Sequence, residues 1–185
     1  MIDWTSIETA IKTWLSNSTT IDSSKIIFTH QKTPLLADGS YLTLKIEPPR
    51  KIGFDEVQYN TDLGQPAGQE VQQTVTGPRE FILLVQAYTI QEFGSGTAKE
   101  LLGAAEIALG KPSQVDAFNA VGIGYFASEP MNSLPVLGPD GQGRAQLDLH
   151  FIVFDKVVDP VGYIATMGTD QPTGQKYPKG TYSGP

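Results

Sequence analysis

The sequence predicts an α/β domain of the α+β type, with a single mixed, largely antiparallel sheet packed by two main helices. Apolar residues recur at helical spacing in residues 5–16 and 98–109, which indicates two amphipathic helices. Apolar and polar residues alternate in residues 41–47 and 145–153, which is typical of half-buried strands. The chain has 185 residues, enough to bury one hydrophobic core, and it shows no internal repeat. We therefore expect one domain.

The first helix is expected to begin at a capping box, in which Thr5 caps the helix and Glu8 reaches back from three positions later. Trp4 and Trp14 share its apolar stripe, so we interpret both as core residues. A carbohydrate-binding module would instead need a row of exposed aromatic residues. The residues predicted to face the core are Trp4, Ile7, Ile11, Trp14 and Leu15.

The second helix is expected to begin at another capping box, formed by Thr97 and Glu100. Gly110 followed by Pro112 is a stop signal, because glycine favours the end of a helix and proline cannot continue it. Residues 114–119 favour a further helical turn. The residues predicted to face inward are Leu101, Ala105, Ala108 and Leu109.

Strands are predicted where β-branched, aromatic and other apolar residues cluster between turn signals. Residues 81–85 are continuously apolar, which indicates a central strand covered on both faces. In residues 51–59, Ile52, Phe54 and Val57 are the apolar positions of another strand. The other predicted strands are residues 25–31, 41–47, 121–126 and 145–153, and residues 162–167 favour a short strand or helical turn.

Two loops and a tail are predicted to lie outside this framework. Residues 60–77 are rich in Gln, Gly and Thr and predict a long loop or a hairpin arm, and residues 131–143 contain the turn sequence Pro139-Asp140-Gly141. Residues 168–185 lack the apolar content to fold alone, so we expect a domain over residues 1–167 and a flexible or partner-ordered tail. The candidate partner contacts in these segments are Gln65, Gln69, Gln72, Gln73, Asp140, Gln142, Tyr177 and Tyr182.

Composition and charge exclude several classes of function. The chain has no cysteine, which excludes disulfides and thiolate chemistry, and fits assembly in a reducing cytosol. Its net charge of −7 argues against a protein that grips nucleic acid by neutralising phosphates. No run of about 18 apolar residues predicts a membrane span, and residues 1–15 lack the pattern of a signal peptide.

No catalytic, cofactor-binding or metal-binding residue is predicted. The only histidines, His30 and His150, lie on predicted strands, and we interpret His150 as a residue of the polar strand face. Residues 94–99, Gly-Ser-Gly-Thr-Ala-Lys, fail the phosphate-loop pattern and predict a tight turn before a capped helix. No nucleophile elbow of a serine hydrolase occurs.

Carboxylates leave one alternative from the enzyme class. A glycosidase or metal-dependent nuclease needs two or three carboxylates that converge in a cleft. Nothing in their spacing requires convergence, and solvated strand faces and turns explain them more simply. The carboxylates that such an enzyme would draw on are Asp55, Glu56, Asp148, Asp155 and Asp159.

Several segments, taken in order and spacing, resemble the phage neck terminator family over residues 1–167. The earlier segments are Tyr41–Ile46, Ile52–Glu56, Gly77–Phe81 and Val85–Tyr88, and the later ones are Thr97-Ala98, Val121–Ile123, Arg144–Leu149 and Asp159–Ile164. Known members end soon after the Gly-Tyr-Ile segment, so residues 168–185 depart from the pattern and would form a partner-specific arm.

The resemblance implies a structural virion protein at the head-tail interface of a tailed bacteriophage, assembled in the host cytoplasm. It implies a homo-oligomeric ring, hexameric by family analogy, that terminates the tail tube and binds the head-tail connector proteins. DNA would pass through the lumen without sequence-specific binding, and no membrane or cofactor is involved. A head-completion adaptor on the portal side remains an open alternative.

Overall fold

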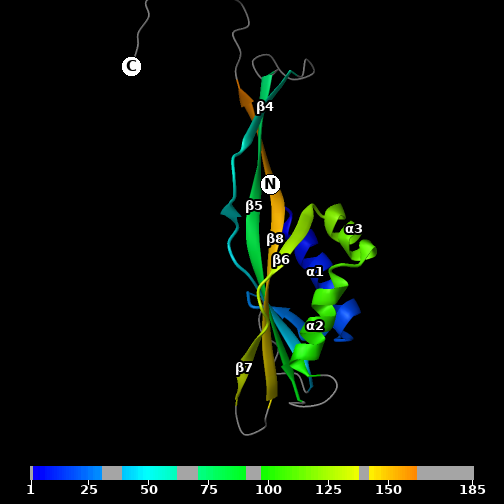
Figure 1. The fold of residues 1–185 in the computed structure, drawn as a ribbon. Coiled ribbons are helices and arrows are strands. Elements are labelled where there is room, and N and C mark those ends of the chain that lie inside the picture. Colours follow the sequence, from blue (N-terminus) through cyan, green and yellow to red (C-terminus); the bar gives the residue numbers. More distant parts are fainter. Residues whose placement is uncertain (1, 31–38, 62–70, 91–96, 138–141, 162–185) are drawn as a thin grey trace, which may run out of the picture. The chain divides into compact units, whose positions relative to one another are not determined.

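A computed structural model of the chain describes residues 2–30, 39–61, 71–90, 97–137 and 142–161 (Figure 1). The chain divides into two compact units. The first contains residues 1–57 and 75–157, and the second contains residues 58–74 and 158–185. The described residues of the second unit all belong to strands. The predicted boundary at residue 167 lies outside the described residues.

The described part of the chain contains three α-helices and one 3-10 helix. The helices are α1 (Trp4–Thr19), the 3-10 helix η1 (Ser23–Lys25), α2 (Ala98–Ala108) and α3 (Pro112–Ala120). The strands are β1 (Ile26–Phe28), β2 (Tyr41–Ile46), β3 (Arg50–Lys51), β4 (Glu56–Thr61), β5 (Val71–Thr89), β6 (Ile123–Ser128), β7 (Asn132–Leu137) and β8 (Gln142–Val161).

All the strands belong to one sheet, whose main order is β1-β2-β5-β8-β6. β1 is parallel to β2, whereas β2 is antiparallel to β5 and β6 is antiparallel to β8. β3 and β4 also pair with β5, and β7 pairs with β8. The sheet is therefore mixed and largely antiparallel, and the predicted fold class is confirmed.

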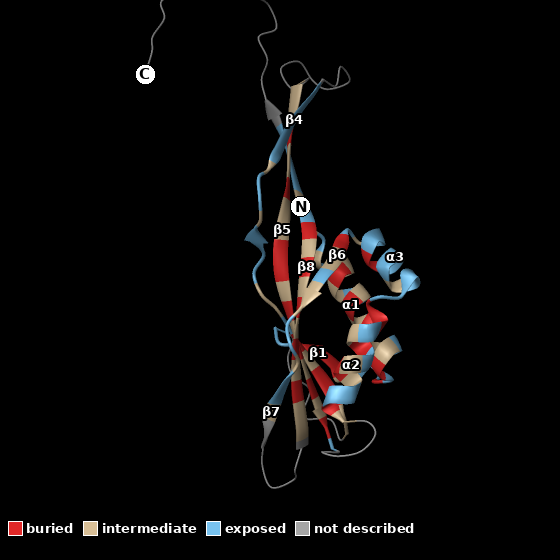
Figure 2. Cartoon of the chain, in the orientation of Figure 1, coloured by how far each residue is buried: buried red, intermediate tan, exposed pale blue. Residues whose placement is uncertain are grey.

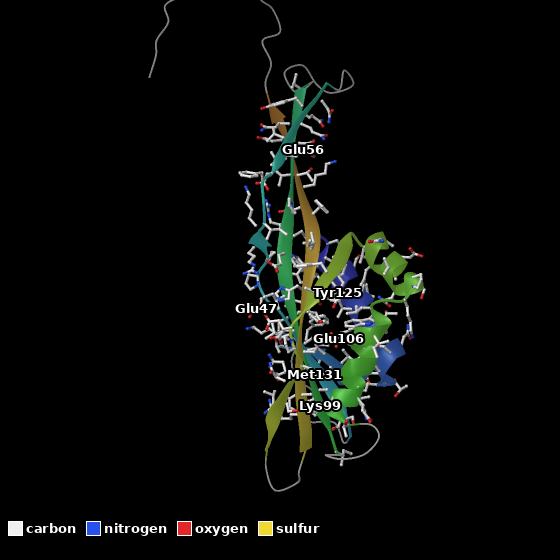
Figure 3. All side chains as sticks on the ribbon, in the orientation of Figure 1. Glu47, Glu56, Lys99, Glu106, Tyr125 and Met131 are labelled. Atoms are coloured by element: carbon white, nitrogen blue, oxygen red, sulfur yellow. The ribbon has the colours of Figure 1, made fainter. Side chains whose placement is uncertain are left out.

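The helices of the first unit cover one face of the sheet (Figure 1). Alternate strand residues are buried against them, as the striped colouring of Figure 2 shows. Burial in β8 follows the predicted alternation without exception, from Ala145 to Val153. The indole nitrogen of Trp14 donates a hydrogen bond of 3.2 Å to the carbonyl of Ala105, which joins α1 to α2 within this core. The hydroxyl of Ser128 in β6 donates a hydrogen bond of 2.5 Å to the carboxylate of Glu106 in α2, and this bond joins the two elements. Glu106 is labelled in Figure 3.

The first helix begins one residue earlier than predicted, and its cap is a different residue. Asp3 is the N-cap: its carboxylate accepts a hydrogen bond of 3.2 Å from the backbone of Ser6 and one of 2.6 Å from the Ser6 hydroxyl. The predicted Thr5–Glu8 capping box is therefore wrong. An aspartate two residues upstream satisfies the exposed amides first, because carboxylates are strong N-caps. The helix ends at Thr19, and the residue that caps it, Thr20, adopts a left-handed conformation with φ of 60°.

The second helix follows its prediction at the N-terminus, where the Thr97 hydroxyl accepts a hydrogen bond of 3.4 Å from the backbone of Glu100. Its inward face contains Leu102, fully buried, whereas Leu101 is only partly buried, so the predicted face is shifted by one residue there. Pro112 does not only stop this helix. It is the first residue of α3, where its missing amide hydrogen costs nothing.

Three strand predictions need correction. From Phe81 to the end of β5 only alternate residues are buried, so Phe81 and Leu83 face the helices while Ile82 and Leu84 lie half-buried on the other face. The predicted strand over residues 51–59 is interrupted between β3 and β4, and Phe54 is 95% exposed there. Residues 60–61 and 71–77 are strand, which confirms the hairpin alternative for the described part of that loop. The predicted loop over residues 131–143 likewise contains β7 and the start of β8.

Candidate assembly surface on the open face of the sheet

The sheet has a second face that the described helices do not cover, which we call the open face. Its residues alternate with the buried ones along β2, β5 and β8, and most are half-buried. Hydrogen bonds and ring stacking connect many of its polar and aromatic side chains across neighbouring strands. The residues that form it are Thr43, Lys45, Ile82, Leu84, Gln86, Tyr88, Gln146, Asp148, His150 and Ile152.

An aromatic and arginine network occupies one part of the open face. The rings of Tyr41 and Tyr88 are stacked with their centres 4.5 Å apart, and the guanidinium of Arg144 lies 4.9 Å from the centre of the Tyr88 ring. Arg144 Nη2 donates to the Tyr88 hydroxyl at 3.1 Å, and that hydroxyl donates to Gln86 at 2.9 Å. Burial is the main reason why the pKa of Tyr41 is raised.

The network continues from β5 to β8 through side-chain amides. Gln86 Nε2 donates to Gln146 Oε1 at 2.9 Å, and Gln146 Nε2 donates to Asp148 Oδ1 at 2.9 Å. Each amide is held by its neighbours in one orientation. A partner that docks here meets side chains that have already lost rotamer freedom, which lowers the entropic cost of binding.

A row of ionisable side chains runs across the sheet from β3 through β5 and β8 to the end of β6. Arg50 of β3 donates to Glu80 of β5, and the other oxygen of Glu80 lies 2.7 Å from His150 Nδ1 on β8. His150 Nε2 lies 3.4 Å from a carboxylate oxygen of Glu129, which follows β6. Glu80 is only 5% exposed, and the hydrogen bonds with Arg50 and then His150 hold its pKa below the ordinary value. Burial of this carboxylate is therefore compensated by its two partners.

The Phe54 loop, residues Ile52–Asp55, joins β3 to β4. Gly53 adopts φ of +72°, a conformation that glycine tolerates best, and the next side chain, Phe54, is 95% exposed. Asp55 fixes the loop, because its carboxylate accepts from Lys51 Nζ at 2.8 Å and from Arg79 Nη1 at 2.6 Å. These bonds lower the pKa of Asp55 to about 2, with the Arg79 bond as the largest cause.

Gly77 of β5 makes room for that carboxylate. A Cβ atom at position 77 would lie 1.8 Å from Asp55 Oδ1, far inside van der Waals contact. Any other residue at this position would have to displace the Asp55 carboxylate and the Arg79 guanidinium, so glycine is favoured here by a close approach of side chains and not by an unusual backbone angle. The sequence shows Gly77 as part of a turn-rich segment, and this packing reason appears only in the structure.

At the β6 edge of the sheet lies an apolar hollow of about 390 Å³, which we call the β6 groove. Phe126 and Phe154 are 51% and 64% exposed and flank it. The Phe126 ring packs edge-on against the imidazole of His150, so the groove adjoins the row of ionisable side chains that contains His150. The residues that line the groove are Asn119, Gly122, Ile123, Gly124, Tyr125, Phe126, Ile152 and Phe154.

The candidate contacts predicted from the sequence fall largely outside the described residues. Gln72 and Gln73 lie half-buried in β5, and Gln142 is the first residue of β8. Gln65, Gln69, Asp140, Tyr177 and Tyr182 lie outside the described residues, so the group stays a prediction. The residues that sequence reasoning missed are Phe54, Arg144 and Glu80. Gly53 was the one available signal, since a glycine before an apolar residue can turn that residue away from a strand.

The carboxylates weighed for an enzyme serve other purposes where the structure shows their contacts. Asp55 pairs with two cations, and Asp148 accepts from Gln146. Within the described ranges, no group of three or more histidine and acidic side chains is placed to hold a metal ion. None of the described helices is long and apolar enough to cross a bilayer.

The family model of the phage neck terminator protein matches residues 5–175 of the chain. The chain belongs to the phage neck terminator protein family. The resemblance seen in its sequence is thereby confirmed. This neck terminator family protein is a structural protein of the phage neck and tail region, and its place is the virion.

Two solved structures align with this neck terminator family protein over most of both chains. One is 16% identical, with 83% of this chain and 96% of the other covered, at a TM-score of 0.36. The second is described as the virion of a native gene transfer agent particle and is 13% identical, with 80% and 97% covered, also at a TM-score of 0.36. At these values neither structure carries an argument about fold or function. No curated protein matches the chain.

Proposed function

We propose that this protein forms a hexameric ring that terminates the tail tube and joins it to the head-tail connector. Membership of the neck terminator family supports the position in the virion. The observation that carries the ring is the presence of exposed large apolar residues on separate parts of the sheet, Phe54 at 95% and Phe154 at 64% exposure. Exposed aromatic residues of this size are typical of protein interfaces.

The charge of the chain fits a passage for DNA. With a net charge of −7, the protein repels the phosphate backbone overall, so DNA can slide through a ring lumen without being held. The ring assembles in the host cytoplasm and carries no cofactor or catalytic site. Residues 1–167 form the folded domain, and residues 168–185, with Tyr177 and Tyr182, form an arm that contacts the tube or the connector.

The function is tested by adding the purified full chain to polymerising tube protein of the same phage and imaging the tubes by negative-stain electron microscopy. We expect rings at one end of each tube and an arrest of elongation at that end. Tubes that elongate as they do without the chain, and bare tube ends, would contradict termination. If the chain does not bind tubes but binds the purified connector, the protein is a head-completion adaptor and not a tail terminator.

A further inference from the structure

Two exposed apolar features lie on opposite edges of the sheet. The Phe54 loop follows β3, which pairs with β5, and the β6 groove lies along β6, which pairs with β8. β5 and β8 are neighbours and lie between them. Within the described residues neither β3 nor β6 has a further strand beside it. The chain thus has the protruding phenyl side chain of Phe54 on one edge and an apolar groove on the other.

The loop that carries Phe54 is anchored at its end, although none of the described residues covers the Phe54 side chain. Asp55 ties the end of the loop to Lys51 and to Arg79 of β5, and Gly53 sets the backbone direction. A 95% exposed phenylalanine costs free energy in water, and because the loop backbone is anchored, the loop loses little conformational entropy when this side chain docks. Such a residue is suited to act as an anchor in an interface.

The β6 groove has the size and chemistry to receive a phenyl ring. Its volume is about 390 Å³, whereas an apolar cavity of about 150 Å³ is enough to hold benzene. Gly124 keeps it open: a Cβ atom at this position would meet no atom within 4 Å. Phe126, Ile152 and Phe154 supply apolar walls.

The charges on the two edges are complementary. Beside the Phe54 loop, the side chains of Arg50 and Lys51 are 65% and 52% exposed. Beside the groove, the side chain of Glu129 is 55% exposed, and it touches His150, against which the groove residue Phe126 packs. Arg50 and Lys51 are paired with Glu80 and Asp55 of their own chain, but both side chains remain more than half exposed. Exposed cationic groups therefore lie beside the Phe54 loop, and an exposed carboxylate lies beside the groove.

We propose that Phe54 of one copy inserts into the β6 groove of the next copy, with Arg50 and Lys51 of the first facing Glu129 of the second. The inference rests on the proposed ring. The two patches differ and lie on opposite edges, so the contact is head-to-tail: the copy that donates Phe54 keeps a free groove, and the copy that receives it keeps a free loop. Repetition of such a contact closes a ring, whereas a two-fold contact between identical patches would stop at a dimer.

Two substitutions test the contact from its two sides. Phe54→Ala removes the anchor and leaves the groove intact, whereas Gly124→Leu fills the groove and leaves the anchor intact. Neither should change the fold, because Phe54 is exposed and the Gly124 site is open and has no left-handed φ. The matched control is Ile107→Ala on α2, which also removes an exposed apolar side chain, 77% accessible, that belongs neither to the Phe54 loop nor to the lining of the β6 groove. Circular dichroism confirms that each variant folds.

The readout is the native mass of each protein and of an equimolar mixture of the two variants. Under conditions in which the unmodified chain and Ile107→Ala form rings, each variant alone should lose the ring. The mixture should give a two-chain species and nothing larger, because one intact loop meets one intact groove and neither remaining site can propagate.

Rings formed by either variant alone would overturn this contact while leaving the proposed function standing. Loss of rings in both variants without the two-chain species in the mixture would overturn the pairing of loop with groove. If the unmodified chain forms no ring, either alone or on tube ends, both the proposed function and this contact fail.

Discussion

Asp55 anchors the loop that presents Phe54, the most exposed large apolar side chain of the described residues, and it does so as a carboxylate. Its pKa is about 2 in the folded chain against an ordinary value of 3.8, because it accepts from Arg79 and Lys51. The folded pKa is depressed, so this carboxylate stabilises the fold fully above the unfolded pKa. That contribution is lost as the pH falls from about 4 through about 2.

We predict that Asp55→Asn lowers the unfolding midpoint at neutral pH and that the difference from the unmodified chain shrinks below about pH 4. Urea unfolding between about pH 7 and pH 2 measures this difference. Asp116→Asn, an exposed aspartate on α3, is the matched control, and its difference should remain small throughout. If the difference in unfolding midpoint between Asp55→Asn and the unmodified chain is the same at every pH, the ion pairs of Asp55 are not its cause.

The same residue illustrates what the sequence can and cannot indicate. Asp55 was considered as one of several carboxylates of an enzyme, because composition does not show which charges meet. Its partner Arg79 lies 24 positions away, and the contact depends on Gly77 being too small to block it. Such a contact requires the strand register, which no local pattern contains.

At the scale of elements, the alternating pattern of β8 predicted its buried face correctly. Phe151 is the centre of that face. Its ring lies 5.4 Å from Phe81, 5.6 Å from Phe118 and 5.8 Å from Tyr125, measured between ring centres. It thereby links β5 and the consecutive elements α3 and β6 to β8.

Phe151→Ala should lower the free energy of unfolding by about 3–5 kcal/mol, because it removes a fully buried ring and leaves a cavity among three others. Chemical denaturation monitored by circular dichroism measures the change. Phe154→Ala is the matched control on the same strand. Its ring is 64% exposed, and we expect a change of about 0.5 kcal/mol or less. Equal effects of the two substitutions would contradict the assigned faces of β8.

Element boundaries were predictable only where burial imposes a period. β2, α2 and β8 each pack one face against the core, and their patterns are legible in the sequence. The N-terminal part of β5 contains few core residues, and its polar composition predicts a loop; residues 132–137 of β7 lie beside the turn sequence Pro139-Asp140-Gly141 and are likewise predicted as loop. The break between β3 and β4 was missed for the opposite reason. Phe54 is apolar but faces solvent, and apolar residues are normally read as buried.

At the scale of the whole molecule, the fold class and the family could be predicted, since both depend on patterns that extend over most of the chain. The pairing of the Phe54 loop with the β6 groove could not. It depends on which strands form the two edges of the sheet, and edge positions follow from the strand order, not from composition. A head-to-tail contact also joins two different patches, so it can be inferred from one copy only after both patches have been located.

Native mass spectrometry of the full chain, alone and released from capped tube ends, tests the ring most directly. We predict one closed species of six chains, about 120 kDa, six times the 20.0 kDa of one chain. Only single chains of 20.0 kDa in both samples, with no discrete larger species, would contradict the account of this protein as a ring that ends the tail tube.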